Sequence, residues 1–248
     1  MNLCIDQGNS RTKIALFNEK GKLVKGLMYK SFSSADVERL FSLYRIENSI
    51  ISSVINIEPA VVNALHRLSK QFIFFDHLTP IPIQNLYDTP ETLGLDRLAA
   101  AVGAVTLCPD SNLLIIDAGS AITYDYVSAE GQYLGGNIAP GIKMRLSVLS
   151  QMTKKLPRID VDENELIPFF GKNTRDAMAA GVVRGVIFEA KGYMRTLDER
   201  VEKYKTLLTG GNAVYLYSHV QDQVRWEKYL VLMGLNRILE YNMSIKNL

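Results

Sequence analysis

A short acidic turn occurs twice in this chain, once near the N-terminus and once near the middle. Residues 5–17 read IDQGNSRTKIALF, and residues 115–127 read IIDAGSAITYDYV. Three positions recur at a constant offset of 111 residues, namely Asp6 with Asp117, Gly8 with Gly119, and Thr12 with Thr123. Because this offset divides the chain nearly in half, the repeat predicts two similar units, each opening with a strand that ends in Asp and turns through Gly.

The hydrophobic pattern of the first half predicts a strand, a hairpin and then alternating helices and strands. A capping signal marks the start of the first helix, because Ser33 stands three residues before Asp36. The expected elements are a strand at 3–9, a hairpin of 10–17 and 22–29, a helix at 33–46, strands at 49–55 and 72–77 around a helix at 58–70, and an Ala-rich helix at 93–107.

The second half repeats this order loosely. Its expected elements are a strand at 113–121, a strand pair at 122–127 and 133–138, helices at 141–155 and 173–202, a strand at 206–211 and a final helix at 225–241. The segment CPDSN at 108–112 is the best boundary, which gives domains 1–111 and 112–248. Two such units predict an α/β molecule of two lobes with a ligand cleft between them.

Composition limits the partners that this chain can have. Its 248 residues are 47% hydrophobic, which is enough for a large core. Lys and Arg number 28 against 26 for Asp and Glu, and no stretch collects five or more like charges, so neither a nucleic-acid site nor a membrane site is expected. There is no apolar span or signal peptide pattern, and Cys4 and Cys108 have no metal spacing. We therefore expect a soluble, cytoplasmic protein with two structural cysteines.

The repeated turn has a physical interpretation as a phosphate-binding device. Small residues after Asp6, namely Gly8, Asn9 and Ser10, leave backbone N–H groups open to the close approach of an anion. Two copies could hold a polyphosphate from both sides. A carboxylate repels phosphate oxygens, so at least one of the two must act through a cation, most plausibly Mg²⁺ held through water. A single Asp-Gly turn would more often be a plain connection between strands.

Six short motifs in a fixed order carry a resemblance that extends over nearly the whole chain. They are DxGNSxxK at 6–13, YDTPETLGLDR at 87–97, IIDAGSAIT at 115–123, GGNIAPGIKM at 135–144, NTRDA at 173–177 and LLTGGNA at 207–213. Together they resemble type III pantothenate kinase, a member of the actin and sugar kinase superfamily of ATPases. The resemblance implies two lobes of the actin-like ATPase (ribonuclease H-like) fold with a nucleotide cleft between them. It also implies ATP-dependent phosphorylation of pantothenate to 4'-phosphopantothenate in coenzyme A biosynthesis, with Mg²⁺, a monovalent cation (K⁺ or NH₄⁺) and a homodimer.

The resemblance also implies roles for individual residues. Asp96 matches the catalytic base, Asp6 is expected near Mg²⁺ through water, and Asp117 is expected to bind the monovalent cation. The ATP contacts fall on Asp6, Gln7, Gly8, Asn9, Ser10, Arg11, Thr12, Lys13, Ser120, Gly210 and Gly211. The pantothenate contacts fall on Tyr87, Gly94, Leu95, Asp96, Arg97 and Thr174. Serine replaces the more frequent threonine at 10 and 120, which keeps the hydroxyl. Leu95 occupies a variable place in the family and is bulkier than the small residues often found there, so the resemblance does not define the fit of pantothenate at this residue.

Asp96 also has a bottom-up argument. Phosphoryl transfer needs a positioned carboxylate to accept the alcohol proton and cations to neutralise the transferring group. An Asp in a first helical turn is equally expected for the helix dipole alone, so the residues by themselves leave both readings open. Two other function classes remain: a sugar or polyol kinase of the same superfamily, and a non-catalytic ATP-binding regulator of the same fold. Segment 135–144 is expected near pantothenate or a hinge, and the dimer interface around 174–193.

Overall fold

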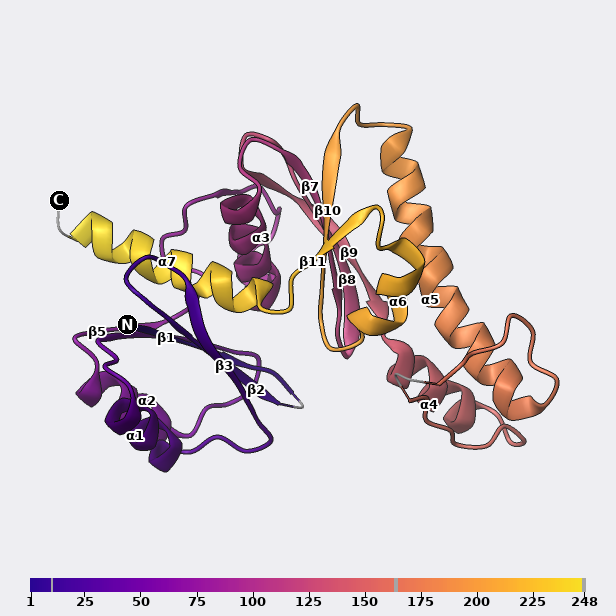
Figure 1. The fold of residues 1–248 in the computed structure, drawn as a ribbon, viewed down its shortest axis with the longest axis horizontal. Helices are drawn as coiled ribbons and strands as arrows, with labels where there is room; N and C mark the ends of the chain where they lie inside the picture. Colours follow the sequence, from indigo (N-terminus) through magenta and orange to yellow (C-terminus); the bar gives the residue numbers. More distant parts are fainter. Residues whose placement is uncertain (10, 163–164, 247–248) are drawn as a thin grey trace. The chain divides into compact units, whose positions relative to one another are not determined.

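The computed structural model describes residues 1–9, 11–162 and 165–246 (Figure 1). The chain forms two compact units. The first comprises Met1–Pro109, Gly131–Tyr133 and Tyr229–Leu248, and the second comprises Asp110–Glu130 and Leu134–Lys228. The C-terminal helix therefore belongs to the first unit. A division into residues 1–111 and 112–248 would place it in the second unit.

The first unit is built on a sheet with the strand order β3-β2-β1-β4-β5. Its strands are β1 (Asn2–Gln7), β2 (Thr12–Phe17), β3 (Leu23–Tyr29), β4 (Asn48–Ser53) and β5 (Gln71–Phe74). Strand β1 is antiparallel to β2 and parallel to β4. Helices α1 (Ser34–Leu43) and α2 (Pro59–Leu68) pack against each other. As the capping signal predicts, the carboxylate of Asp36 accepts a hydrogen bond from the backbone N–H of Ser33 at 3.0 Å.

Alternation along β1 separates the two faces of this sheet. Leu3 and Ile5 lie in a core cluster with residues of α1 and α2. Cys4 points to the opposite face, where its Sγ lies 4.0 Å from Oδ1 of Asn236 in α7 (Leu230–Lys246). Because side chains of a strand alternate, Asp6 shares this second face with Cys4. Burial raises the pKa of the Cys4 thiol, and both cysteines are buried and free, as expected of structural residues.

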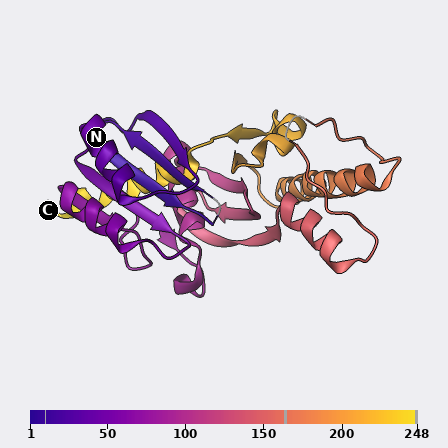
Figure 2. The ribbon, with the colours of Figure 1, turned by 90° about the horizontal axis from the view of Figure 1, so that it is seen from below.

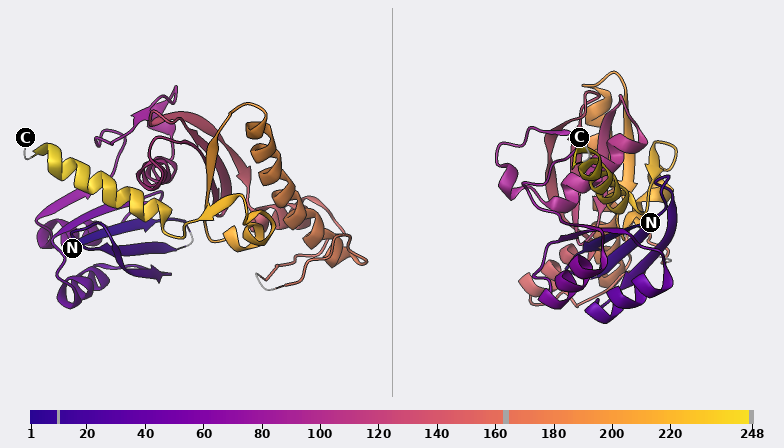
Figure 3. Two further views of the ribbon diagram at one scale, coloured as in Figure 1. Left: turned by 45° about the horizontal axis from the view of Figure 1, so that its top comes forward. Right: turned by 90° about the vertical axis from the view of Figure 1, so that its left-hand side faces the viewer.

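Helices α3 (Leu95–Leu107) and α7 pack tightly together within the first unit. In the left view of Figure 3, α3 is seen nearly end-on while α7 runs across it. Glycines at 103 and 234 permit this close crossing, because a Cβ atom at Gly234 would collide with the carbonyl oxygen of Ala99. Helix α7 also contacts β1, which explains why the end of the chain returns to the first unit.

The second unit repeats the topology of the first. Its strand order is β11-β10-β7-β8-β9, so each unit places its opening strand third and its hairpin at one side. The elements are β7 (Asn112–Ala118), β8 (Ala121–Val127), β9 (Gln132–Pro140), α4 (Ile142–Met152), α5 (Thr174–Asp198), β10 (Tyr204–Thr209), α6 (Ala213–Val220) and β11 (Val224–Trp226). Helices α4 and α5 lie side by side (Figure 2). The first residues of β9 belong to the first unit, where they pair with β6 (Gln84–Asn85).

The predicted fold class is confirmed, with two corrections in the second unit. The prediction omitted α6 and β11, which follow β10 directly. It also started the last helix at residue 225, whereas residues 224–226 form β11 and the helix begins at Leu230. Strand β11 pairs with β10 through only three residues, Val224, Arg225 and Trp226, so its sequence carries little period-two signal.

Candidate active site

Asp6 lies near the C-terminal end of β1 and is 8% exposed. Its direct partners are Lys13 on the antiparallel strand β2 and Ser52 on the parallel strand β4. Directly opposed residues point to the same face of a sheet, with Cβ atoms about 5 Å apart across an antiparallel pair. A carboxylate, an ammonium group and a hydroxyl therefore share one end of the sheet. Among the described residues, the buried Ser52 hydroxyl has no hydrogen-bond partner.

Asp117 occupies the same position in the second unit, near the end of β7. Its direct partners are Thr123 on β8 and Thr209 on β10. Within the part of the chain that the structure describes, the buried Thr123 hydroxyl also lacks a hydrogen-bond partner. The two sites differ in charge, since the cross-strand neighbour of Asp117 is a threonine where that of Asp6 is a lysine.

The two turns differ in length by one residue. In the first, Gln7 pairs with Thr12, which leaves residues 8–11 in the loop; in the second, Ala118 pairs with Ile122, which leaves residues 119–121. The alignment of Thr12 with Thr123 is therefore wrong in three dimensions. Thr123 faces Asp117, but the residue that faces Asp6 is Lys13. The constant offset of 111 hid this shift because a threonine follows the first turn directly and the second turn after one residue.

The segments around Asp117 pack together closely. The backbone N–H of Asn212 donates to the carbonyl oxygen of Ala118 at 2.7 Å, and its side-chain Nδ2 donates to that of Gly119, also at 2.7 Å. The N–H of Gly141 donates to the carbonyl oxygen of Ser120 at 3.1 Å. The structure thus brings together the predicted residues Asp117, Ser120 and Gly210, of which Ser120 is exposed. Gly211 follows directly, and a Cβ atom there would meet nothing within 4 Å. Gly141, near the end of motif 135–144, also lies against this turn, because a Cβ atom there would collide with the carbonyl oxygen of Ser120.

Asp96 lies in the first turn of α3, which begins after Gly94. Its Oδ1 accepts a hydrogen bond from the backbone N–H of Arg97 at 2.9 Å, and its side chain is half-buried. A Cβ atom at Gly94 would stand 2.6 Å from this Oδ1, so glycine leaves the space that the carboxylate uses. Helix α3 packs on α7 and β4, and α7 packs on the sheet face that Asp6 shares.

The predicted pantothenate contacts in the first unit are partly brought together. The guanidinium carbon of Arg97 lies 5.9 Å from the ring centroid of Tyr87, and Arg97 is buried. The ring of Tyr133 lies 6.2 Å from that of Tyr87 and is fully buried. Tyr133 is not among the predicted site residues, because nothing in its strand-like surroundings distinguishes it from a core residue. Leu95 is half-buried beside Asp96.

The remaining predicted residues lie at loop and helix ends. Thr174 is the exposed first residue of α5, in the second unit. Asn9 and Arg11 are exposed, and Nη1 of Arg11 lies 3.0 Å from Sδ of Met28. Ser10 lies outside the described residues. Among the described residues there is no group of three or more His, Cys, Asp or Glu that could hold a metal ion alone, and no helix is long and apolar enough to span a membrane.

Comparisons with known proteins agree with one another. The family model for type III pantothenate kinase matches residues 2–196. A type III pantothenate kinase of Phocaeicola vulgatus is 42% identical over 242 residues, which cover 98% of this chain and 99% of the relative. One from Bacteroides fragilis is 40% identical over 243 residues, 98% of each chain. A solved Campylobacter jejuni protein assigned to the Baf family of transcriptional activators has the same fold, with a TM-score of 0.64, 23% identity, and coverage of 98% of this chain and 99% of that one. The chain belongs to the type III pantothenate kinase family.

Proposed function

We propose that this chain transfers the terminal phosphoryl group of ATP to the primary hydroxyl of pantothenate, with Asp96 as the general base. Pantothenate phosphorylation is the activity of the family, and it is the first step of coenzyme A biosynthesis. The observation that carries the residue assignment is the setting of Asp96. Its carboxylate is half-buried at the start of a packed helix and accepts from the backbone N–H of the buried Arg97, whose guanidinium group lies over the ring of Tyr87.

The chemistry follows from this setting. A carboxylate at a helix start can accept the proton of an alcohol as that oxygen attacks phosphorus. The neighbouring Arg97 offers guanidinium N–H donors, and Tyr87 offers a flat apolar surface, which together suit the carboxylate and the hydrocarbon part of pantothenate. Because both side chains come from the same unit as Asp96, the acceptor hydroxyl and its base would be held within one unit.

The phosphates of ATP are assigned to the two Asp-Gly turns. Lys13 supplies positive charge opposite Asp6. The N–H of Gly8 donates to the carbonyl oxygen of Arg11 at 3.1 Å, contrary to the expectation that it is open to an anion, so N–H groups for phosphate would have to come from elsewhere in this turn. One carboxylate with waters and phosphate oxygens is a common environment for Mg²⁺ in kinases, so Asp6 would hold that ion through water. When bound, Mg²⁺ would neutralise charge on the transferring group.

Asp117 is assigned to a monovalent cation, K⁺ or NH₄⁺. The support is that the two residues paired with Asp117 on the neighbouring strands, Thr123 and Thr209, both bring hydroxyl oxygen atoms. Ser120, Gly210 and Gly211 would contact the nucleotide from the loops that pack around this carboxylate. Oxygen-rich surroundings with one negative charge favour a weakly hydrated cation.

A homodimer is proposed through the α4 and α5 side of the second unit. Large apolar side chains are exposed there, namely Met144, Val148 and Met152 on α4, Phe169 and Phe170 before α5, and Phe188 on α5. Such a set of exposed apolar residues is typical of a surface that another protein covers. In a dimer with two-fold symmetry, the same surface of a second copy would cover these side chains. A cytoplasmic location follows from the substrate and is proposed on that ground.

The decisive experiment measures ATP consumption with and without pantothenate. We expect ADP production that depends on pantothenate, with 4'-phosphopantothenate as the product. Turnover with a panel of sugars and polyols but not with pantothenate would favour the sugar kinase alternative. ATP binding without turnover on any acceptor would favour the non-catalytic regulator and would contradict the proposal.

A further inference from the structure

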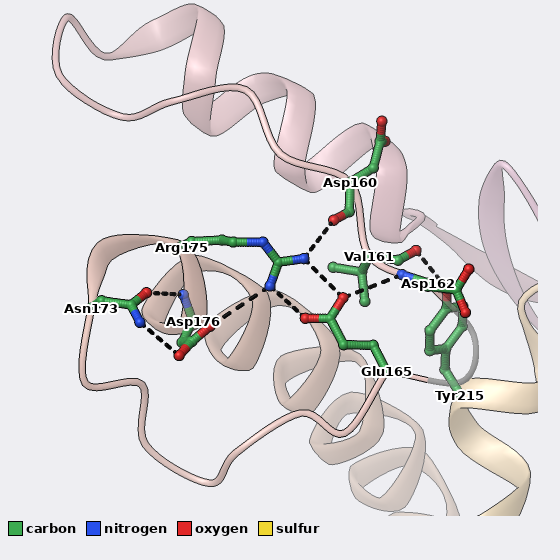
Figure 4. A network of polar contacts seen from close by, with 8 residues as sticks. All are labelled: Asp160, Val161, Asp162, Glu165, Asn173, Arg175, Asp176 and Tyr215. Atoms are coloured by element: carbon green, nitrogen blue, oxygen red, sulfur yellow. Dashed lines mark hydrogen bonds and ion pairs between the residues drawn. The ribbon is translucent and has the colours of Figure 1, made fainter.

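The connection between α4 and α5 is held in place by side chains of the helices that flank it. The guanidinium group of Arg175, in the first turn of α5, donates to both carboxylate oxygens of Glu165, at 2.5 and 2.9 Å (Figure 4). It also donates to the carbonyl oxygen of Asp160 at 3.3 Å. We refer to Glu165, Arg175 and the carbonyl group of Asp160 as the α5 clasp. Its hydrogen bonds hold the pKa of the Glu165 carboxyl below its ordinary value.

A second arginine of α5 continues the attachment along the connection. Nε of Arg184 donates to the carbonyl oxygen of Pro168 at 2.7 Å, and its Nη2 donates to that of Ile167 at 2.9 Å. The same guanidinium carbon lies 4.7 Å from the ring centroid of Phe169. From α6, the hydroxyl of Tyr215 donates to the carbonyl oxygen of Val161 at 2.9 Å. The described part of this connection has no regular secondary structure of its own. Hydrogen bonds from charged and polar side chains therefore hold it in place.

The connection meets the first turn of α5 in direct contact. A Cβ atom at Gly171 would collide with backbone atoms of Asp176 and Ala177, so only glycine allows this approach. Asn173 caps the helix, since its Oδ1 accepts from the N–H of Asp176 at 2.9 Å while its Nδ2 donates to the carboxylate of Asp176 at 2.8 Å. Arg175 stands between these two devices, with Nη1 also 3.7 Å from Oδ1 of Asp176.

Thr174 lies inside this arrangement, one residue before Arg175 and one after the cap. Within residues 1–9, 11–162 and 165–246, its exposed hydroxyl makes no hydrogen bond, so the side chain is held only through its backbone. Whatever fixes the first turn of α5 therefore fixes the hydroxyl. When a contact to a bound substrate is misplaced by about 1 Å, the reaction can become as much as 10²-fold slower. Residues that hold Thr174 in place without touching the substrate can therefore affect the reaction.

We propose that the α5 clasp positions Thr174 for pantothenate, which makes Glu165 and Arg175 positioning residues for that substrate. The inference rests on the proposed role of Thr174 as a pantothenate contact. Neither clasp residue touches ATP or the acceptor hydroxyl in this scheme. Loosening the clasp should therefore weaken the use of pantothenate and leave the use of ATP unchanged.

The test compares Glu165→Gln, Arg175→Met and Arg175→Lys with the unaltered full-length chain. We expect KM for pantothenate to rise by roughly tenfold in Arg175→Met and in Glu165→Gln, with KM for ATP and kcat changed less than about twofold. Lysine keeps the charge but loses the two-pronged donor geometry, so Arg175→Lys should give an intermediate rise. Hydrogen exchange of residues 165–172 should become faster in the same order.

A matched control lies on the same helix. Nε of Arg195 is 3.6 Å from Oε1 of Glu199, an exposed ion pair near the other end of α5. Arg195→Met removes the same kind of side chain from the same element, and we expect no change in KM for pantothenate. An equal rise in this control would overturn the proposal, because the effect would then be a general one of α5.

Two further outcomes separate the inference from the function on which it rests. If the clasp variants exchange faster at 165–172 but keep KM for pantothenate, the clasp is only a structural tie and the inference is wrong, while the function stands. Thr174→Val tests the premise itself, and it should raise KM for pantothenate at least as much as Arg175→Met. If Thr174→Val leaves KM unchanged while pantothenate is still phosphorylated, the role of Thr174 is wrong and the inference falls with it.

Discussion

The Oδ1 atom of Asp117 lies 2.5 Å from the point where a Cβ atom at Gly210 would stand. Gly210 also has a φ of +97°, a conformation that other residues rarely adopt. The loop after β10 can therefore pass beside the Asp117 carboxylate only because residue 210 has no side chain. The same point lies 2.5 Å from the backbone carbonyl of Ala118, so the constraint comes from main chain as well as from the carboxylate.

Gly210→Ala should consequently damage the site around Asp117. We expect a loss of stability of about 1–3 kcal/mol from backbone strain, together with a rise in KM for ATP of tenfold or more. Thermal unfolding and steady-state kinetics measure the two effects. Gly211→Ala is the matched control for stability, because a Cβ atom there would meet nothing within 4 Å, and it should leave the free energy of unfolding nearly unchanged. Similar losses in the two variants would contradict the role given to the close approach at 210.

Much of the fold could be predicted from local pattern. The hairpins, the capped helix at α1 and the long helix α5 have strong periodicity or strong end signals, and the repeated turn predicted two units of one topology. Helix α6 and strand β11 were missed because each is short, with eight and three residues, which leaves too little sequence for a periodic pattern.

Other features depend on contacts that sequence reasoning could not anticipate. The return of α7 to the first unit rests on its close crossing with α3, where Gly103 and Gly234 are indistinguishable in sequence from ordinary helix glycines. The one-residue difference between the two turns depends on strand register, which decides that Lys13 and Thr123 are the equivalent neighbours. The clasp joins Glu165 and Arg175 across an irregular connection, where no period exists to indicate a pairing.

The monovalent cation gives a prediction about salts. If Asp117 binds this ion with nearby hydroxyl oxygens, activity should require K⁺ or NH₄⁺ and fall sharply in Na⁺ at equal ionic strength, because a site of long oxygen bonds suits the larger ion. Asp117→Asn removes one negative charge and should abolish the dependence together with most activity. Initial rates in the three chloride salts provide the measurement. Equal rates in all three would show that the assignment of Asp117 is wrong.

The exposed apolar side chains of α4 and α5 give a prediction about assembly. Phe188→Glu should shift the protein from dimer to monomer in sedimentation velocity, because a charge would be buried in the proposed contact. Dissociation should weaken the use of pantothenate more than the binding of ATP if Thr174 acts near that contact. Leu78→Glu, at an exposed apolar residue of the first unit, is the control and should remain dimeric. A wild-type protein that is an active monomer would contradict the proposal.

The α5 clasp gives a prediction about pH. The hydrogen bonds from Arg175 lower the pKa of Glu165 from its ordinary 4.5, so the ionised carboxylate stabilises the folded connection. This contribution is complete above pH 4.5 and is lost as the pH falls through the lowered pKa. Hydrogen exchange of residues 165–172, corrected for intrinsic rates, should therefore be constant from neutral pH down to 4.5 and accelerate below it. Glu165→Gln should exchange faster than the unaltered protein at neutral pH and should lose the acid dependence.

Asp96 and Asp6 are two carboxylates of one unit with different assigned roles, and matched substitutions separate them. Asp96→Asn keeps the size and much of the hydrogen bonding of the side chain but cannot accept the substrate proton. We expect kcat to fall by about 10²–10⁴ with little change in ATP binding. Asp6→Asn should instead weaken the use of Mg·ATP, because the lost carboxylate serves the metal, and added Mg²⁺ should partly restore the rate.

Nucleotide binding by calorimetry and turnover at several Mg²⁺ concentrations measure the difference. Both variants should remain folded: Asp96 lies half-buried in a first helical turn, and Asp6, although buried, lies at a strand end where asparagine preserves the shape. If Asp96→Asn retained near-normal turnover, its carboxylate would serve only the start of α3. If it lost ATP binding as severely as Asp6→Asn, Asp96 would serve the metal, and the base would have to be sought elsewhere in the site.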